Sequence, residues 1–214
     1  MTAVTNLNNL IENLKKISTH KVNIIAVSKT FSLNAIKPLI NVGHIHFGEN
    51  RISEALEKWT DEIFHNPSIQ LHLIGRLQSN KVGDALKIFS YIHSLDSKKL
   101  AEKLCFEQEK MQKNLKYFIQ VNFENERQKG GILENEIKEF LNFCKIEKKL
   151  NVIGLMCIPP VDKPPEVYFK KLQFLAKANN LSELSMGMSG DYLKAIDFGS
   201  SFIRIGSLIF GDRK

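Results

Sequence analysis

The sequence predicts an α/β protein, a single (β/α)8 TIM barrel that spans residues 1–214 and has an additional N-terminal helix within residues 1–21. Two observations predict this fold class. Short runs of β-branched and apolar residues alternate along the chain with segments of helical periodicity, and eight such runs are present. Strict alternation of strands and helices is typical of a parallel sheet, and eight repeats favour closure into a barrel.

The predicted strands are short, and each ends at a polar or glycine-rich turn. They are Val22–Ser28, His44–Phe47, Gln70–Ile74, Tyr91–Ser94, Lys116–Asn122, Asn151–Cys157, Glu183–Met186 and Phe202–Ile205. The predicted helices between them are Leu33–Val42, Ile52–Trp59, Asn80–Phe89, Ser97–Gln112, Leu133–Cys144, Pro165–Ala178 and Tyr192–Ala195.

The leading segment has the spacing of an amphipathic helix, with one apolar face formed by Leu7, Leu10, Ile11, Leu14 and Ile17. We expect this helix to cover the bottom of the barrel or to fill a gap in its outer ring of helices. An open, doubly wound sheet is the alternative fold. That fold usually has a G-x-G-x-x-G turn after the first strand, whereas this chain has Val27-Ser28-Lys29-Thr30 there.

Composition argues against several classes of function. The chain is 43% hydrophobic and 25% charged, as in ordinary globular proteins, and it has no run of about 20 apolar residues that would span a membrane. The N-terminal segment lacks the apolar stretch of a secretory signal, and the three cysteines are scattered, so we expect a cytoplasmic protein without disulfides or structural zinc. The net charge of +7 comes from lysines interleaved with glutamates, so we do not expect nucleic-acid binding.

The residues with chemical potential gather where the predicted strands end. They include Lys29, Gly48-Glu49-Asn50, Gly75–Lys81, Asp96, Asn122–Gly131, Gly187–Asp191 and Gly206-Ser207. The turns at the opposite ends of the strands are ordinary polar connectors. Because barrel enzymes build their sites at the C-terminal ends of the strands, we expect the functional site at this face.

Lys29 follows the apolar run Asn23–Ser28 at the mouth of the predicted barrel. Apolar surroundings disfavour the ammonium form, lower the lysine pKa and free the amine to attack an aldehyde. The alternative is a solvated lysine that begins an ordinary loop.

Two turns near the C-terminus favour a phosphate site. Residues 186–191 supply two glycines and the Ser189 hydroxyl before a helix, and Gly206 and Ser207 follow the last strand. The turns after strands 7 and 8 are a frequent phosphate site in this fold, although glycines also serve simply to shape tight turns. Arg204 shares a strand face with Phe202 and Gly206, and its buried charge needs a partner, either a carboxylate or a ligand's ring nitrogen.

The chain resembles a known family, the pyridoxal-phosphate homeostasis proteins (YggS/PROSC), which are related to the N-terminal barrel of alanine racemase. The matching segments are AVSKT (26–30), FGENR (47–51), HLIGRLQSNK (72–81), QKGGI (128–132), GLMCIPP (154–160), LSMGMSGD (184–191) and RIGSLIFG (204–211). The resemblance implies a monomeric barrel that holds pyridoxal 5'-phosphate as a Schiff base on Lys29. It also implies that Arg204 faces the pyridine nitrogen, that Asn50 helps to wall the ring, and that the phosphate is held by Ser189, Gly206 and Ser207.

Four positions remain without an assigned chemical role. Many relatives have a second lysine two residues after the Schiff-base lysine, and this chain has Phe31 there. Lys129, in the loop after the fifth strand, is either a transient acceptor of cofactor or a solvated side chain. His72 and Glu49 lie within the matching motifs, where a supporting role in the core is the expectation.

The expected contact between Arg204 and the pyridine nitrogen of the cofactor predicts a carrier and not a robust enzyme. Arginine can only donate hydrogen bonds, so a nitrogen facing Arg204 stays unprotonated and the cofactor withdraws electrons weakly. We expect no second domain that would supply another acid or base, and the tyrosines lie in strand or helix patterns. We therefore assign no catalytic residue and predict a protein that buffers pyridoxal phosphate and delivers it transiently to apoenzymes, which affects amino-acid and 2-oxo-acid metabolism.

Two other functions compete with this prediction. One is a weak racemase, or a Schiff-base lyase of the aldolase type that uses Lys29. The other is a metallohydrolase, suggested by His44 and His46 on one strand face and by His72 and His93 on neighbouring strands. No carboxylate-rich ligand set accompanies these histidines, so no metal site is predicted.

Overall fold

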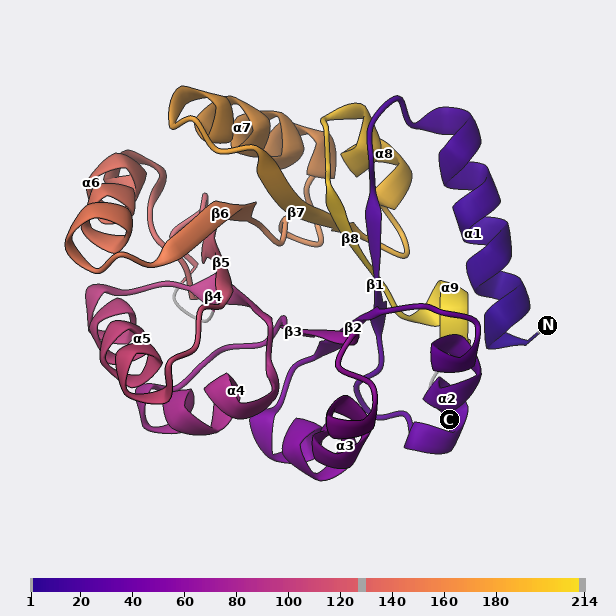
Figure 1. Cartoon of the computed structure of the whole chain (residues 1–214). Coiled ribbons are helices and arrows are strands. Elements are labelled where there is room, and N and C mark those ends of the chain that lie inside the picture. The colour runs from indigo at the N-terminus through magenta and orange to yellow at the C-terminus, as the bar shows by residue number, and fades with distance from the viewer. Residues whose placement is uncertain (1, 127–129, 212–214) are drawn as a thin grey trace.

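The computed structural model describes residues 2–126 and 130–211, and it confirms the predicted barrel (Figure 1). Eight parallel strands pair in chain order, and the first strand pairs with the last to close the sheet. The strands are β1 Asn23–Val27, β2 His46–Glu49, β3 Gln70–Leu73, β4 Tyr91–Leu95, β5 Lys116–Gln120, β6 Asn151–Met156, β7 Glu183–Met188 and β8 Phe202–Ile205.

Helices surround the strands on all sides (Figure 1). The α-helices are α1 Ala3–Ile17, α2 Leu33–Asn41, α3 Ile52–His65, α4 Val82–Ile88, α5 Lys98–Met111, α6 Ile137–Asn142, α7 Pro165–Ala178, α8 Tyr192–Asp197 and α9 Ser207–Phe210. Two 3-10 segments, η1 Ser79–Lys81 and η2 Glu134–Glu136, precede α4 and α6, and the π-helical segment η3 Phe143–Glu147 follows α6.

The leading helix fills a place in the outer ring, which decides between the two positions predicted for it. In Figure 1, α1 stands between α8 and α2, and it contacts α2 and α9. Its buried face consists of Leu7, Leu10 and Leu14, and Asn6 donates a hydrogen bond to the carbonyl of Ile209 at 3.0 Å. The last helix of the barrel, α9, is only four residues long, so α1 covers surface that α9 leaves open.

The core divides into two apolar layers. The larger layer lies between the strands and the surrounding helices, where Trp59 and Phe169 are fully buried. The smaller layer lies inside the barrel and consists of Ile25, Tyr91, Phe118, Met156 and Phe202. The interior also contains buried polar side chains, which are described below with the site.

Several predicted boundaries are wrong by a few residues, because strand pairing and packing decide them. The second strand begins at His46 and not at His44, and it includes Gly48 and Glu49, because residues 46–49 pair with β3. The helix predicted to end at Trp59 continues to His65, where Ile63 packs against the core. The single helix predicted over 133–144 is instead η2, α6 and η3 in succession.

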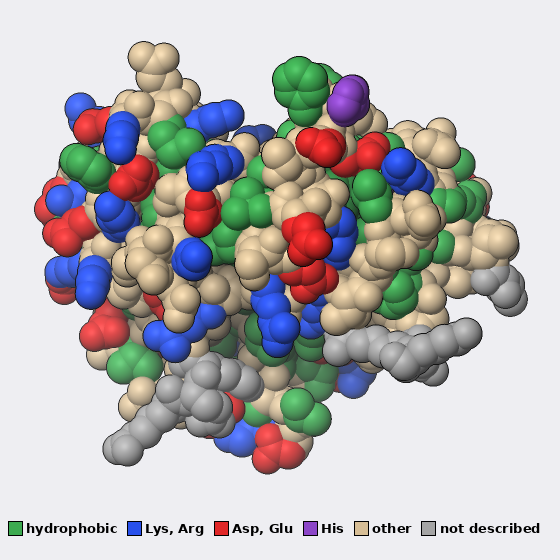
Figure 2. Space-filling model, turned by 90° about the horizontal axis from the view of Figure 1, so that it is seen from below, with side chains coloured by type: hydrophobic (Ala, Val, Ile, Leu, Met, Phe, Trp, Pro, Cys, Tyr) green, Lys and Arg blue, Asp and Glu red, His purple; other side chains and the backbone are tan. Residues whose placement is uncertain are grey.

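Figure 2 shows lysine and arginine side chains interspersed with aspartate and glutamate over the face that it displays. Ion pairs between such side chains include Lys98–Glu139 (2.6 Å) and Lys103–Glu107 (2.8 Å). Among residues 2–126 and 130–211, no helix is both long and apolar enough to cross a membrane.

Candidate functional site

A cavity of about 550 Å³ opens at the C-terminal ends of the strands, and every predicted site residue lines it. These residues are Lys29, Asn50, Ser189, Arg204, Gly206 and Ser207. Apolar side chains complete the wall, namely Val27, Phe31, Ile74, Ile158 and Met188. The structure therefore brings together residues that are up to 178 positions apart in the sequence (29 to 207).

The amine and the guanidinium meet because β1 and β8 are neighbours. Ile25 of β1 is in register with Arg204 of β8, and Gly206 lies beside Val27. Alternate residues of a strand point to the same side, so Ile25, Val27 and Lys29 form a column from the barrel interior to its mouth. Lys29 is half-buried and lines the same cavity as Arg204.

Arg204 is buried inside the barrel, and its partners are dipoles. Its Nη1 donates to the carbonyl and the hydroxyl of Ser185, both at 2.9 Å, and its Nη2 donates to the carbonyl of Cys157 at 3.1 Å. Burial lowers the pKa of Arg204 from its ordinary value. Among the described residues its hydrogen-bond partners are Ser185 and Cys157, and no carboxylate is among them.

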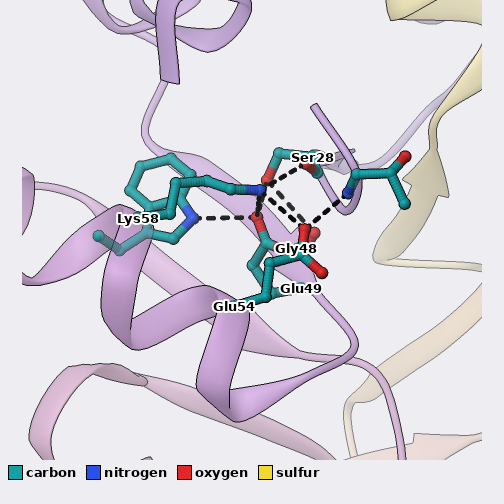
Figure 3. Close-up of polar contacts among 7 residues, drawn as sticks. Ser28, Gly48, Glu49, Glu54 and Lys58 are labelled. Carbon is teal, nitrogen blue, oxygen red and sulfur yellow. Dashed lines mark hydrogen bonds and ion pairs between the residues drawn. The ribbon is translucent and has the colours of Figure 1, made fainter. Parts of the chain in front are cut away.

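A buried polar network anchors the strand end that carries Lys29 (Figure 3). The fully buried Glu49 accepts three hydrogen bonds on Oε1, from the Ser28 hydroxyl (2.8 Å), Lys58 Nζ (3.0 Å) and Trp59 Nε1 (3.0 Å). Lys58 Nζ also donates to the Ser28 carbonyl at 3.0 Å. Ser28, the residue before Lys29, is thus tied to β2 and α3 through both its side chain and its backbone.

Thr30, on the other side of Lys29, adopts a left-handed conformation with φ of 70°. This region is unfavourable for a β-branched residue, so surrounding contacts must hold it. Its N–H donates to Glu54 Oε1 at 2.7 Å, and Lys58 contacts the same oxygen at 3.2 Å (Figure 3). Burial raises the pKa of Glu54, but the Thr30 hydrogen bond and Lys58 outweigh it, so the pKa lies below its ordinary value.

The two glycine-containing turns close the other side of the cavity. The register of β7 with β8 shifts between residues 185 and 188, and Gly187 has φ of +90° there. A Cβ atom on Gly187 would lie 2.6 Å from the Cβ of Ala195, so glycine is required. The Gly206 N–H donates to the Ser189 hydroxyl at 3.3 Å, which joins the two turns.

Asn50 is positioned by a close backbone contact. A Cβ atom on Gly75 would lie 2.2 Å from the Asn50 carbonyl oxygen, so the turn after β3 packs against Asn50 only because residue 75 is glycine. Both segments belong to the motifs singled out in the sequence, and the structure supplies their mutual contact.

The four histidines of the metallohydrolase alternative do not converge on a common point. The rings of His46, His72 and His93 bond to one another through their nitrogens at 2.9–3.0 Å, and His44 Nε2 is 2.8 Å from the carbonyl oxygen of His46. Within residues 2–126 and 130–211, no group of three or more His, Cys, Asp or Glu side chains has a geometry that could hold a metal ion.

Two other sequence predictions have different outcomes. Phe31 lines the cavity and stacks on Phe210, with ring centroids 4.6 Å apart, so it forms part of the apolar wall at the mouth. Lys129 lies outside the described residues.

The role of Glu54 and Lys58 was not predicted, although their i,i+4 spacing on α3 is a sequence signal for an ion pair.

Comparison with known proteins agrees with this fold. A family model described as "Alanine racemase, N-terminal domain" matches residues 5–214. The solved structure of an alanine racemase from Clostridium difficile has a TM-score of 0.74 at 14% identity, and the match covers 98% of this chain and 57% of that chain, so it shows the fold alone. The barrel therefore falls in the class defined by the N-terminal domain of alanine racemase.

More similar relatives narrow this class. A pyridoxal phosphate homeostasis protein from Synechocystis is 38% identical, over 90% of this chain and 92% of its own. Another from Aquifex aeolicus is 37% identical, over 89% and 87%. The structure of PipY from Synechococcus elongatus with PLP bound has a TM-score of 0.87 at 32% identity, over 98% of this chain and all of PipY. The chain belongs to the pyridoxal phosphate homeostasis protein family.

We expect Glu49→Ala to lower the free energy of unfolding by about 3–5 kcal/mol, because it leaves the largely buried ammonium of Lys58 without its buried partner. Urea unfolding of the purified variant measures this loss. Glu12→Ala, which breaks the exposed Glu12–Lys15 pair, is the matched control and should change stability far less. Equal losses in the two variants would contradict the anchoring role of Glu49.

The buried histidines also predict a loss of stability in acid. Burial, and then repulsion from His44, Lys21 and Lys116, lowers the pKa of His46 to about 4, whereas an unfolded histidine has a pKa near 6.5. Between these values the unfolded chain binds more protons, so the free energy of unfolding falls as pH drops from about 6.5 to about 4.

His46→Gln removes this titrating group, and we expect it to flatten the dependence of the unfolding free energy on pH by up to about 1.4 kcal/mol per pH unit within that window. Urea unfolding of both proteins at pH 7, 6, 5 and 4 measures the difference in slope. Parallel curves for the two proteins would show that His46 is protonated alike in the folded and unfolded states.

Proposed function

We propose that this chain is a pyridoxal phosphate carrier, a single cofactor-binding barrel that holds the cofactor as a Schiff base on Lys29. The observation that carries the proposal is the convergence of an amine, a guanidinium and two glycine-containing turns on one cavity. The names of the relatives and the PLP-bound PipY structure support the same ligand.

The lining groups fit the parts of this ligand. Pyridoxal phosphate supplies an aldehyde, an aromatic ring nitrogen and a phosphate. Lys29 would take the aldehyde, and Arg204 would face the ring nitrogen, to which it can only donate. Hydroxyl and backbone N–H groups of Ser189, Gly206 and Ser207 suit a phosphate, and Asn50 with the apolar wall suits the ring.

The covalent step uses only the amine and the aldehyde. With pyridoxal phosphate bound, Lys29 would supply the amine whose Nζ forms a C=N bond with the aldehyde carbon in place of C=O, with the oxygen released as one water molecule. Water would reverse this step and return the aldehyde and the lysine, whereas a second amine would take over the C=N bond and also free the lysine. Reversal is what a protein that stores and releases the cofactor requires.

The carrier role is supported by what lines the cavity. Within the described part of the chain, Lys29 and Arg204 are the titratable side chains in its wall. Tyr192, the tyrosine of the helix after β7, is instead hydrogen-bonded to Asn13 at 3.2 Å. A racemase needs a second acid or base beside the substrate carbon. We propose that the barrel acts as a cytoplasmic monomer that delivers cofactor to pyridoxal-phosphate-dependent apoenzymes and lacks robust catalysis.

Lys29→Ala should abolish the covalent complex, because it removes the attacking amine, while the barrel stays folded. The measurements are the absorbance spectrum of the purified protein with pyridoxal phosphate, borohydride reduction and peptide mapping of the labelled lysine. Lys116→Ala, at the opposite end of the barrel, is the control and should keep the label on Lys29.

Label on another lysine of the parent protein would refute the assignment of Lys29. Incubation with single amino-acid enantiomers in deuterium oxide tests the carrier role separately. Deuterium exchange at Cα with many turnovers would overturn the carrier role and favour the racemase.

The double variant Ser189→Ala with Ser207→Ala should weaken pyridoxal phosphate binding by about tenfold or more, because each hydroxyl contributes a hydrogen bond to a charged phosphate. Its affinity for pyridoxal, which lacks the phosphate, should not change. Equilibrium titration monitored by absorbance measures both dissociation constants. Ser182→Ala, at the opposite end of the barrel, is the control, and an equal loss for both ligands would place the phosphate elsewhere.

A further inference from the structure

A continuous chain of hydrogen bonds crosses the barrel interior from the mouth cavity to the opposite end. Arg204 Nη1 is 2.9 Å from Ser185 Oγ, which is 2.8 Å from His93 Nδ1. His93 Nε2 is 2.9 Å from His72 Nδ1, and His72 Nε2 is 3.0 Å from His46 Nδ1. The five side chains come from β8, β7, β4, β3 and β2.

The first link sets the direction of all the others. A guanidinium can only donate, so the Ser185 oxygen accepts from Arg204. The hydroxyl has one hydrogen, and His93 Nδ1 is its acceptor among the described residues. His93 then carries its proton on Nε2 and donates to His72, which does the same toward His46.

The reverse direction fails at its first step. If His93 donated to Ser185, the serine oxygen would accept two hydrogen bonds, from the ring and from Arg204, and its own hydrogen would have no acceptor among the described residues. Loss of a hydrogen bond by a buried group is unfavourable. The donor-only chemistry of one arginine thus propagates through three rings.

The chain compensates a buried positive charge without adding a negative one. Arg204 is 4% exposed, and its described partners are Ser185 and Cys157, not an acid. Hydrogen bonds in series polarise one another, so donation from Ser185 to His93 makes the serine oxygen a stronger acceptor for the guanidinium. Burial, and then the charge of Arg204, lowers the pKa of His93 well below its ordinary value, which keeps the chain neutral.

The two ends of the chain open on different cavities. Arg204 lines the mouth cavity. His46 lines a second cavity at the N-terminal ends of the strands, together with Lys21, Lys116 and Tyr91. His72 and His93, between them, are fully buried and stack on Tyr91 and Phe118. The apolar layer inside the barrel therefore shields the middle of the hydrogen-bond chain from water.

We propose that Ser185, His93, His72 and His46 are positioning residues, which hold the guanidinium of Arg204 in place through a one-directional chain in which every histidine is protonated on Nε2. The consequence for the cofactor rests on the proposed function. A carboxylate in place of Ser185 would neutralise the charge of Arg204, whereas the neutral hydrogen-bond chain leaves that charge for the ring nitrogen of the cofactor.

The test uses the protein without cofactor, so its result is independent of the proposed function. Long-range proton–nitrogen correlation spectra of histidine-labelled protein at pH 7.5 distinguish the two neutral forms of each ring and the charged form. We expect the pattern of a neutral ring protonated on Nε2 for all three histidines, assigned with single His→Gln variants. A ring protonated on Nδ1, or a charged ring, at His93 or His72 would overturn the proposal even if Lys29 binds the cofactor.

A second measurement tests positioning. Ser185→Ala removes the link between Arg204 and His93, so we expect the same spectra to show a mixture of the two neutral forms of His93, protonated on Nδ1 or on Nε2. We also expect the dissociation constant for pyridoxal phosphate to rise by about tenfold. Ser185→Thr keeps the hydroxyl and should restore both. Ser200→Ala is the matched control, because Ser200 is equally buried and donates to the Met186 carbonyl at 2.7 Å.

Unchanged protonation of His93 in Ser185→Ala would overturn the proposal, as would an equal change in Ser200→Ala. If neither the parent protein nor any variant binds the cofactor, the proposed function fails. The protonation pattern of the three histidine rings still decides whether the one-directional hydrogen-bond chain is present.

Discussion

The pairing of β1 with β8 is the contact on which the rest of this structure depends. It closes the barrel, and it joins two segments that lie almost a whole chain apart, so that Ile25 stands beside Arg204. Alternation along the two strands then decides which side chains point inward and which reach the mouth. Lys29 and Arg204 share a cavity because of this register, and a shift by one residue would turn one of them away from it.

Around this contact, the barrel supports Lys29 and Arg204 in different ways. The strand end that carries Lys29 is held by an ionic network, in which Glu49, Glu54 and Lys58 fix the residues on both sides of the lysine. Arg204 is held by neutral dipoles of Ser185 and Cys157. The difference suits the proposed chemistry, because the amine must reach an aldehyde while the guanidinium must keep its charge for the ring.

Much of this arrangement was predictable from local signals. Eight apolar runs alternating with helical patterns predicted the barrel, and the position of Lys29 after such a run predicted its place at the mouth. Boundaries were less predictable, as at His44, which precedes β2, because the pairing of β2 with β3 decides where the strand begins. The partner of Arg204 was not predictable either, since Ser185 lies on the neighbouring strand beside Phe202, two residues before Arg204.

The sequence by itself determined the order of strands and helices, the face on which the chemistry gathers, and the choice of Lys29, Arg204 and the two glycine-containing turns as site candidates. These depend on hydrophobic periodicity and on residue type, which are local properties of the chain. Only the tertiary structure decided that α1 fills the outer ring and that His46, His72 and His93 bond to one another instead of meeting at a metal. Ring orientation in a packed interior depends on neighbours from several strands at once, and no local pattern records it.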